Sequence, residues 1–373
     1  MFDVIVKHLR HLGFKVFYLQ NITDIDDKII ARARDNGVDP KELARQFEKE
    51  YLKDMKTLGV NSVNKYARAS EYIPQIKSQI ESLLKKQSAY ETKDGSTFFD
   101  ISSFPSYGKL SNQKTEELKD EGGHYHPDKK NQLDFALWKG PKPNEPWFPE
   151  GRPGWHIEDT AITETNFGPQ YDIHGAGLDL IFPHHECEIA QMETISGKEP
   201  LAKYWMHTGF VEIKKEKMSN SLGNFITIRD FLKTNKPEVL RYITLSKHYR
   251  SPIEYNDKII QHAENTLKKL YSFELSDDND IRKRFQEKMN DDFNTPEALA
   301  VIFKHKKWIP EIENIFGISR KVKKEIPKEV KDLLKERQEA RGQEDWKKSD
   351  ELRKKIENLG FLVKDTDKGQ KIT

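Results

Sequence analysis

The segment Tyr171–Glu188 holds the residues best suited to chemistry. An apolar strand is expected to lead into the small-residue turn Gly175–Gly177, and a helix is expected to open at Pro183. His184 and Glu188 stand one helical turn apart, so an imidazole and a carboxylate share one face, which is half of a metal site. A glycine turn before a helix N-terminus is typical of a place for a nucleotide. The turn is not a dinucleotide fingerprint, because the third glycine is missing.

Parallel strands are expected to position this segment. Apolar residues recur at helical spacing from Met1 onward, which predicts a helix that ends at Gly13, a C-terminal cap. Residues 15–19 then predict a buried strand that ends in the polar turn Asn21–Asp27. The chain thus begins inside a helix that feeds a parallel strand. We expect an α/β fold, a Rossmann-like doubly wound parallel sheet with its first strand missing.

The rest of the chain divides into an interrupted α/β part and a helical part. The interval 101–153 is rich in proline, glycine and aromatic residues, which predicts an insertion with little regular structure of its own. After about Arg229 the pattern is almost entirely helical, so we expect an α-helical bundle and a small C-terminal region. The predicted elements are helices over 40–58, 73–86, 237–245, 256–275, 280–289, 296–306 and 328–359, a helix opened by Gly154, a hairpin over 90–100 and a strand near 210–213.

Composition bounds the class of protein. A chain of 373 residues is expected to form roughly two to four domains. The net charge is only +2, but residues 320–373 carry 17 Lys/Arg against 12 Asp/Glu, so this end is +5 and the remainder is −3. A basic end suits a polyanion such as RNA, and it also suits an ordinary solvated helix face. With one cysteine, no signal peptide and no apolar run near the roughly 18 residues of a membrane span, we expect a soluble cytoplasmic monomer without a membrane partner.

Four motifs occur in order along the chain. They are Asn21–Lys28, Trp155–Glu158, Asp172–Glu188 and Lys217–Ser221. Together they resemble the cysteinyl-tRNA synthetases, a family of class I aminoacyl-tRNA ligases. The resemblance covers essentially the whole chain and includes Asp291–Ala298 in the helical part and residues 350–360 near the end. Four ordered motifs are a specific signal, where any one of them would be weak.

The resemblance implies ATP-dependent attachment of cysteine to tRNA(Cys) through a cysteinyl-adenylate, with ATP entering together with Mg²⁺. Charge builds on the α-phosphate in such a reaction, and positive groups aimed there lower the barrier. The family supplies part of that charge from a lysine-methionine-serine-lysine-serine loop, whose counterpart here offers Lys217, Ser219, Asn220 and Ser221 as catalytic residues. Asn220 replaces the second lysine, and losing such a donor typically costs about 10² to 10³ in rate.

The family's other ATP motif, a His-x-Gly-His tetrad after the first strand, is not in this sequence. Residues 11–14 look like a degenerate copy, but they stand at a helix end, where the glycine is expected to be a cap and His11 a surface residue. The tetrad is expected upstream of Met1, in a reading frame that begins late.

The resemblance also implies a zinc ion that selects cysteine through its thiolate. The family's ligands are two cysteines, a histidine and a glutamate; the first cysteine would lie upstream, and Asp159 stands at the second. Asp159, His184 and Glu188 are therefore the expected zinc ligands, a harder set than the family's. Cys187 either supplies a missing sulfur or is simply buried, and His185 is expected to face away from the metal.

The remaining binding residues are carried over from the family. Thr23 and Trp155 are expected to line the pocket for the cysteine side chain and ammonium, with His156 beside them. His174 is either a pocket wall or a packed core histidine. The implied ATP contacts are Gly175, Gly177, Asp179 and Asn220, with the acid accepting from ribose hydroxyls.

The resemblance also implies a domain order. The ranges are 1–88, the first part of a Rossmann-like catalytic domain; 89–153, a connective insertion; 154–215, the second part; 216–250, the loop and a stem-contact region; 251–320, a helical anticodon-binding bundle; and 321–373, a basic C-terminal region. Two other functions stay open. One is a ligase that joins cysteine to an amino sugar, although the helical part and the basic end argue against it. The other is a non-catalytic paralogue that binds RNA or a partner, which Asp159, Asn220 and the absent tetrad favour.

Overall fold

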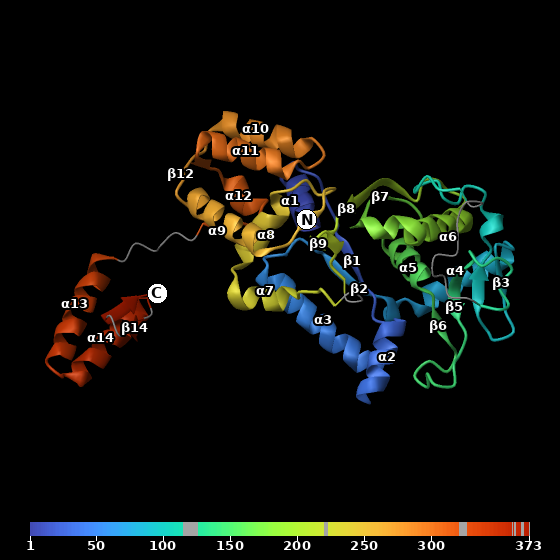
Figure 1. The fold of residues 1–373 in the computed structure, drawn as a ribbon, viewed down its shortest axis with the longest axis horizontal. Coiled ribbons are helices and arrows are strands. Elements are labelled where there is room, and N and C mark those ends of the chain that lie inside the picture. Colours follow the sequence, from blue (N-terminus) through green and yellow to red (C-terminus); the bar gives the residue numbers. More distant parts are fainter. Residues whose placement is uncertain are drawn as a thin grey trace. The chain divides into compact units, whose positions relative to one another are not determined.

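The computed structural model contains two compact units, Met1–Ser319 and Arg320–Thr373 (Figure 1). It describes residues 1–114, 126–219, 223–320, 327–359, 361, 363–366 and 369–372. Within these ranges no helix combines the length and the apolar character needed to cross a membrane.

The first unit opens with a helix and a pair of parallel strands. Helix α1 (Phe2–His11) precedes β1 (Leu19–Ile22), and α2 (Asp27–Asn36) and α3 (Pro40–Thr57) connect β1 to β2 (Lys65–Arg68), which pairs with it in parallel. Asp26 and Asp39 cap the two helices by accepting hydrogen bonds from backbone N–H groups, and Pro40 opens α3. The helix predicted from the Asp39–Pro40 pair is thus confirmed.

The predicted strand over residues 15–19 is wrong by several residues. β1 begins only at Leu19, which pairs with Lys65 at the start of β2. Phe17, inside the predicted strand, is 53% exposed, so this apolar run lies on the surface. The strand starts later than predicted because a strand needs a hydrogen-bonding neighbour, and β2 begins pairing at Lys65.

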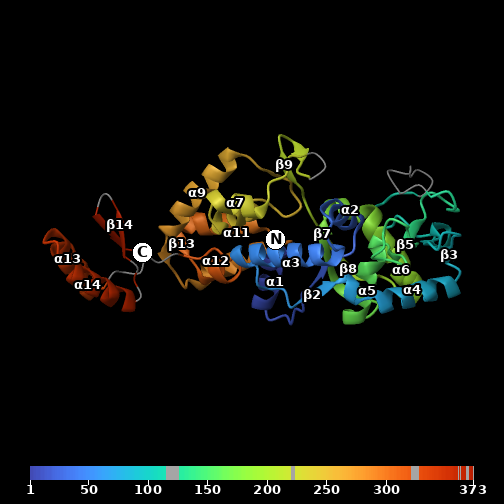
Figure 2. The same ribbon diagram turned by 90° about the horizontal axis from the view of Figure 1, so that it is seen from below.

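A second parallel pair follows later in the chain. β7 (Tyr171–Gly177) pairs with β8 (Ala202–Thr208), and the connection between them contains the short turns η4 (Leu178–Leu180) and η5 (Ile181–His185) and helix α6 (Glu186–Ser196). Helix α5 (Trp155–Phe167) precedes β7 and lies beside α6 (Figures 1 and 2). In the described part of the chain, β1–β2 and β7–β8 are two separate two-stranded sheets.

A four-stranded antiparallel sheet fills the interval between the two parallel pairs. Its order is β3 (Ala89–Glu91), β4 (Thr97–Phe99), β5 (Phe135–Lys139) and β6 (Arg152–Pro153). The predicted hairpin over 90–100 is confirmed as β3 and β4. From there to residue 153 the described residues are mostly irregular, as predicted, with β5 and β6 as short strands, but aromatic residues of this interval belong to a core. Phe99 and Phe135 are both buried, with ring centroids 4.9 Å apart.

The antiparallel sheet shares its core with the helices on either side of it in the sequence. These helices are α4 (Ile73–Lys85), which follows the turn η1 (Ala69–Glu71), and α5 and α6; the turn η2 (Ile101–Ser103) follows β4. Leu83 of α4, Leu137 of β5 and Ile157 of α5 are all fully buried in this one cluster. The interval 89–153 is therefore packed onto the helices that carry the predicted site.

Short strands and helices connect β8 to the helical part. β9 (Val211–Ile213) lies between β10 (Glu216–Lys217) and β11 (Ile253–Glu254), antiparallel to the first and parallel to the second. Helices α7 (Ile228–Thr234) and α8 (Pro237–Leu245) lie between β10 and β11 in the chain. The strand predicted near 210–213 is confirmed as β9, whereas β8 was not predicted.

The helices after α8 share one core with it and with α1. They are α9 (Asp257–Tyr271), α10 (Asn279–Asn290), α11 (Thr295–His305) and α12 (Pro310–Asn314), with β12 (Glu274–Leu275) and β13 (Lys307–Trp308) as a short parallel pair. Val4 of α1 and Phe285 of α10 belong to this core, and Figure 1 shows α1 close to α8. The predicted helices over 237–245, 280–289 and 296–306 are confirmed to within one residue at each end. The helix predicted over 256–275 ends at Tyr271, because Glu274–Leu275 forms β12.

The second unit contains two helices and a hairpin. They are α13 (Lys328–Gly342), α14 (Trp346–Asn358) and the antiparallel strands β14 (Val363–Thr366) and β15 (Gly369–Ile372). The prediction of one helical stretch over 328–359 is wrong. Glu344 adopts a left-handed conformation with φ of 59°, and Asp345 caps α14 by accepting from the backbone N–H of Lys348. The turn folds α14 back so that Ile356 packs with Val330 of α13.

Candidate functional site

Three predicted metal ligands lie together where α5 and α6 begin. Asp159 stands in the first turns of α5, and His184 and Glu188 flank the junction of η5 and α6. His184 Nε2 is 2.9 Å from Asp159 Oδ2 and 3.0 Å from Glu188 Oε1. All three residues are buried. Helical spacing brings His184 and Glu188 together, and the packing of α5 against α6 adds Asp159.

The electrostatics of these three residues favour a bound cation. Burial by itself lowers the pKa of His184, but the carboxylates of Glu188 and Asp159 outweigh it and raise that pKa to about 10. Glu188 is fully buried, and neither of its oxygens accepts a hydrogen bond from the described residues. A buried carboxylate is costly unless a cation pairs with it, and the protonated imidazole of His184, 3.0 Å from Glu188 Oε1, is that cation in this structure.

The donor atoms also fit a zinc ion. One imidazole and two carboxylates are ordinary zinc ligands, and bonds of about 2.0–2.2 Å in a tetrahedral site hold neighbouring donors about 3.4 Å apart. The observed distances of 2.9 and 3.0 Å are a few tenths of an ångström shorter. Small side-chain shifts would therefore suffice to admit the ion.

Trp155 and His156 contact His184. The Trp155 ring centroid is 4.2 Å from that of His184, and the indole is 43% exposed. His156 Nδ1 is 2.7 Å from His184 Nδ1. Burial, followed by the charge on His184, lowers the pKa of His156 well below its ordinary value of 6.5, so neutral His156 accepts the proton of His184 Nδ1. This hydrogen bond leaves His184 Nε2 directed at the carboxylates, as in histidines that bind metals.

His185 joins a second group of possible ligands. His174, His185 and Glu188 have donor atoms that all lie within 4.8 Å of one another. His185 is not part of the group formed by the predicted ligands Asp159, His184 and Glu188, although one of its ring nitrogens lies within 4.8 Å of a Glu188 oxygen. His185 Nδ1 is 2.8 Å from His207 Nε2. His174 stacks on Trp205 with ring centroids 4.7 Å apart, so it is a packed histidine that also borders the ligand cluster.

Cys187 is a packing residue in this structure. Its Sγ is 3.2 Å from the Tyr107 hydroxyl, and the side chain is buried within the core of the antiparallel sheet. Burial raises the pKa of this thiol, which disfavours a thiolate. Cys187 belongs to neither group of ligands in the described residues. Of the two possibilities for Cys187, the structure supports simple burial.

The turn that follows β1 carries Thr23, which is half-buried. Its neighbour Asp24 fixes the turn by accepting from the backbone N–H and the hydroxyl of Ser70, at 2.9 and 2.5 Å. The same turn comes close to α5. Burial, and then the charges of Asp159 and Asp24, raise the pKa of Glu158 well above its ordinary value. The carboxyl end of β1 thus lies near the residues that hold the predicted ligand Asp159.

Three residues expected at ATP lie in the last part of β7 and just after it. A Cβ at Gly175 would lie 2.5 Å from the ring of Phe2, so glycine allows α1 to approach this strand. A Cβ at Gly177 would lie 2.7 Å from Asp179 Oδ1. Asp179 is exposed, and its Oδ2 is 2.6 Å from Lys217 Nζ. A residue predicted to bind ATP, Asp179, therefore pairs with a predicted catalytic residue, Lys217.

The loop 217–224 is described only at its two stems. Asn224 Oδ1 accepts from the backbone N–H of Ser219 at 2.9 Å, and Asn224 Nδ2 donates to the Lys217 carbonyl at 3.2 Å. Ser219 is half-buried. Asn220 and Ser221 lie outside the described residues. The amide of Asn224 thus ties the two stems together beside the predicted phosphate-binding residues.

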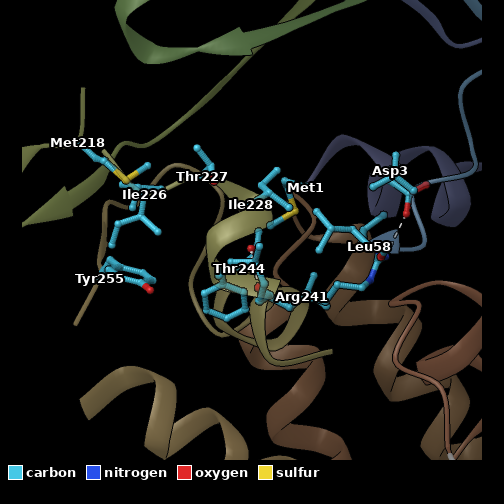
Figure 3. A pocket seen from close by; sticks show the side chains of 16 residues that line it. Met1, Asp3, Leu58, Met218, Ile226, Thr227, Ile228, Arg241, Thr244 and Tyr255 are labelled. Carbon is cyan, nitrogen blue, oxygen red and sulfur yellow. Dashed lines mark hydrogen bonds and ion pairs between the residues drawn. The ribbon is translucent and has the colours of Figure 1, made fainter. Parts of the chain in front are cut away.

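A cavity of about 270 Å³ lies next to this loop (Figure 3). Met218, from the first stem, and Ile226, just past the second, line one side of it, and Met1 and Leu58 line another. None of the predicted site residues lines the cavity, so it is separate from the ligand cluster.

Sequence reasoning missed Trp205 and His207. The two residues are i and i+2 on β8, so they project from the same face of the strand, toward His185. An aromatic residue and a histidine at that spacing were the available signal, but β8 itself was not recognised. His11, expected at the surface, is exposed.

The chain matches three protein-family models. Residues 1–265 match the tRNA synthetases class I (C) catalytic domain, residues 284–340 match the DALR domain, and residues 323–372 match the cysteinyl-tRNA ligase anticodon binding domain. The match to the catalytic domain includes every residue predicted to bind ATP, cysteine or metal.

Similar proteins support the same family. A cysteine–tRNA ligase of Thermodesulfovibrio yellowstonii is 42% identical and aligns over 98% of this chain and 88% of its own length. One of Thermoplasma volcanium is 53% identical over 71% of this chain and 60% of its own length. The methionyl-tRNA synthetase of Mycobacterium tuberculosis bound by methionyl-adenylate superposes with a TM-score of 0.59 at 15% identity, covers 87% of this chain and 81% of its own, and shows the class I, Rossmann-like catalytic fold alone. This chain belongs to the cysteine–tRNA ligase family of class I tRNA synthetases.

Proposed function

We propose that this chain attaches cysteine to tRNA(Cys) in an ATP-dependent reaction that passes through a cysteinyl-adenylate. The observation that carries the proposal is the buried cluster of Asp159, His184 and Glu188 beside the exposed indole of Trp155. His184 and Glu188 of the cluster follow the carboxyl end of β7 in the chain, and ligands of parallel α/β folds bind at that end of the strands. Membership of the cysteine–tRNA ligase family supports the same reaction.

The amino acid binds among Thr23, Trp155, His156 and His174. The exposed face of Trp155 suits the ammonium group, because an aromatic face attracts a cation. Zinc, when held by Asp159, His184 and Glu188, supplies a preference for a thiolate over the hydroxyl of serine.

ATP, as its Mg²⁺ complex, binds where β7 meets the loop 217–224. In this proposal Asp179 accepts from the ribose hydroxyls, next to Gly175 and Gly177, while Lys217 approaches the phosphates. Their 2.6 Å pair must open first. Because both groups are nearly half exposed, the pair is worth only about 0–1 kcal/mol, and ATP can displace it. Ser219, Asn220 and Ser221 complete the phosphate contacts.

The finer architecture is part of the same proposal. We assign β1–β2 and β7–β8 to two halves of one doubly wound sheet whose first strand belongs between them, because each pair ends in a turn that carries predicted site residues. The helical part, residues 251–320, and the basic region, residues 321–373, contact tRNA mainly through its phosphates. A cytoplasmic monomer is the expected state.

The test is amino-acid-dependent exchange of pyrophosphate into ATP by the purified chain, followed by aminoacylation of tRNA(Cys). Cysteine should support exchange far better than serine, and His184→Ala should reduce that preference. His11→Ala, which removes an exposed histidine, is the matched control and should leave it unchanged. Binding of tRNA without any exchange would assign the chain to a non-catalytic paralogue. Transfer of cysteine to an amino sugar but not to tRNA would assign it to the related ligase.

A further inference from the structure

The turn between α10 and α11 holds two consecutive residues in an uncommon backbone conformation. Asp292 has a φ of 50° and Phe293 has a φ of 53°, both in the left-handed region. Aspartate tolerates this region, but a bulky residue such as phenylalanine rarely adopts it. Strain of this kind persists only where the surrounding contacts fix it, and it is most frequent at functional sites. None of the contacts proposed for ATP, cysteine or zinc involves this turn.

Three successive residues after α8 hold Asp292 in place. The Tyr249 hydroxyl donates to Asp292 Oδ1 at 2.8 Å, and Arg250 donates from Nε to Oδ2 at 2.8 Å and from Nη2 to Oδ1 at 3.3 Å. His248 donates from Nε2 to the Asp292 carbonyl at 3.0 Å, and its Nδ1 accepts from the backbone N–H of Arg250 at 3.4 Å. Phe293 packs against a small core shared by α1 and β8. The turn is therefore fixed from several sides.

The contacts with Asp292 also orient the Arg250 guanidinium. Asp292 takes the edge formed by Nε and Nη2, so Nη1 stays outside this pair. The guanidinium carbon lies 4.8 Å from the centroid of the Tyr249 ring, and the Arg250 side chain is 53% exposed. An exposed guanidinium held in one orientation matches the oxygens of a phosphate in both geometry and charge.

The segment that carries Arg250 lies against the carboxyl end of β8. Gly209, the residue after β8, donates its backbone N–H to the Tyr249 carbonyl at 2.8 Å, and a Cβ at Gly209 would lie 2.9 Å from the Arg250 carbonyl oxygen. Burial lowers the pKa of His207 on β8 to about 4, and the charge of Arg250 contributes to this shift. His207 contacts His185, the residue that follows a proposed zinc ligand. Arg250 thus lies near the ligand cluster but at the surface.

We propose that Arg250 binds a backbone phosphate at the acceptor end of tRNA, and that Asp292 is the positioning residue that orients its guanidinium. This inference rests on the function proposed above, because the 3′ end of the tRNA must then reach an adenylate bound beside the ligand cluster. A phosphate near that end passes the surface at the carboxyl end of β8, where the guanidinium is exposed.

The strand arrangement favours RNA over ATP as the source of the phosphate. Lys217, the residue proposed to approach the phosphates of ATP, is on β10, which pairs with one edge of β9. β11, which follows Arg250 in the chain, pairs with the other edge. Because β9 lies between these two strands, Arg250 and Lys217 are assigned to different phosphates.

The test measures binding of tRNA(Cys) to the full purified chain at several salt concentrations. Arg250→Gln should weaken binding about tenfold, which is typical for the loss of a hydrogen bond between charged groups. The slope of log affinity against log salt should become shallower by about 0.7 to 0.9, as for one lost phosphate contact. Arg250→Lys should keep the slope but lose part of the affinity, because an ammonium cannot form the fork. Arg250→Gln and the wild type should bind tRNA(Cys) that lacks its 3′-terminal CCA equally well.

Asp292→Asn separates positioning from simple electrostatics. Asparagine tolerates the left-handed conformation, so the turn can keep its shape. If Asp292 only repelled the RNA, removing its negative charge would strengthen binding. Because it orients Arg250, we expect the variant to bind tRNA(Cys) at least about threefold more weakly. In the Arg250→Gln background the same substitution should weaken binding no further.

Arg34→Gln is the matched control, because the Arg34 side chain, on α2, is 50% exposed and lies 3.9 Å from the carboxylate of Asp35. This variant should bind tRNA(Cys) as the wild type does, and melting temperatures check that every variant is folded.

Four results would overturn the proposal. They are wild-type affinity and slope in a folded Arg250→Gln variant, an equal loss with and without the CCA end, tighter binding by Asp292→Asn, and a higher KM for ATP in pyrophosphate exchange by Arg250→Gln. Because binding is measured without ATP or cysteine, failure of the exchange reaction would leave the phosphate contact standing. Failure of the phosphate contact would likewise leave the exchange reaction untouched.

Discussion

Replacing Arg241 by methionine should destabilise the first unit by removing one buried guanidinium. Arg241, on α8, donates from Nη2 to Asp3 Oδ2 of α1 at 3.0 Å. It also donates from Nε to the Phe316 carbonyl at 2.7 Å and from Nη1 to the Leu58 carbonyl at 3.1 Å. One side chain thus connects the first helix, the end of α3 and the segment after α12. A Cβ at Gly317 would lie 2.6 Å from the guanidinium, so the group is tightly enclosed.

The magnitude follows from what each partner loses. Methionine keeps an apolar stem of similar length but provides no donor. The carbonyls of Phe316 and Leu58 each lose a hydrogen bond, at about 1–3 kcal/mol for a group left buried. Asp3 keeps the Lys7 ammonium at 2.9 Å, so its carboxylate is not left bare. Breaking a buried ion pair by removing one partner costs about 3–5 kcal/mol, and because the terms overlap we expect the total in that range.

The assay is urea denaturation followed by circular dichroism, with the slope of the transition checked for constancy. Arg229→Met is the matched control, because the Arg229 side chain is 44% exposed where it pairs with Glu50 and Asp54, and its loss should cost less than about 1 kcal/mol. Asp3→Asn should be less costly in the Arg241→Met background than in the wild type, since the pair is already broken. Equal midpoints for Arg241→Met and Arg229→Met would refute the argument that this network holds α1 in place.

Four further predictions concern pH, metal, ATP and RNA. Burial raises the pKa of Asp3, but Lys7 and Arg241 outweigh it and hold the pKa at about 2 instead of 3.8. The Asp3 carboxylate therefore contributes about 2 kcal/mol to the free energy of unfolding above pH 4, and this contribution is lost as the pH falls toward 2. In acid unfolding, the Asp3→Asn variant should not show this loss. Asp159→Cys should raise zinc content and the preference for cysteine over serine in pyrophosphate exchange; if neither changes, Asp159 is not a ligand. Asp179→Asn should raise the KM for ATP about 10- to 100-fold without lowering the melting temperature, and an unchanged KM would remove Asp179 from the ribose site. Deleting residues 320–373 should make tRNA affinity less dependent on salt. The slope of log affinity against log salt concentration should become shallower by about 0.7 to 0.9 for each phosphate that is no longer neutralised. An unchanged slope would contradict an RNA-binding role for these residues.

Local features of the sequence determined most helix bounds and two of the three residues in the ligand cluster. Asp39 and Pro40 fix the start of α3 because capping and the φ of proline involve only neighbouring residues. His184 and Glu188 face the same way because they are one helical turn apart, whatever the rest of the fold does. The break between α13 and α14 was not predicted. Its turn needs a left-handed backbone conformation at Glu344, and the sequence has no glycine at that position to indicate it.

Only the tertiary structure decided which partners these residues meet. Adjacent histidines cannot be ranked from spacing: His184 meets Asp159 because α5 packs on α6, and His185 meets His207 because β8 pairs with β7. Cys187 packs in a core together with aromatic residues of the antiparallel sheet. In the sequence, those aromatic residues had suggested an irregular insertion. Such contacts join segments about 20 to 80 residues apart in the chain. Their physical cause is the burial of apolar surface between elements, which local periodicity and capping do not encode.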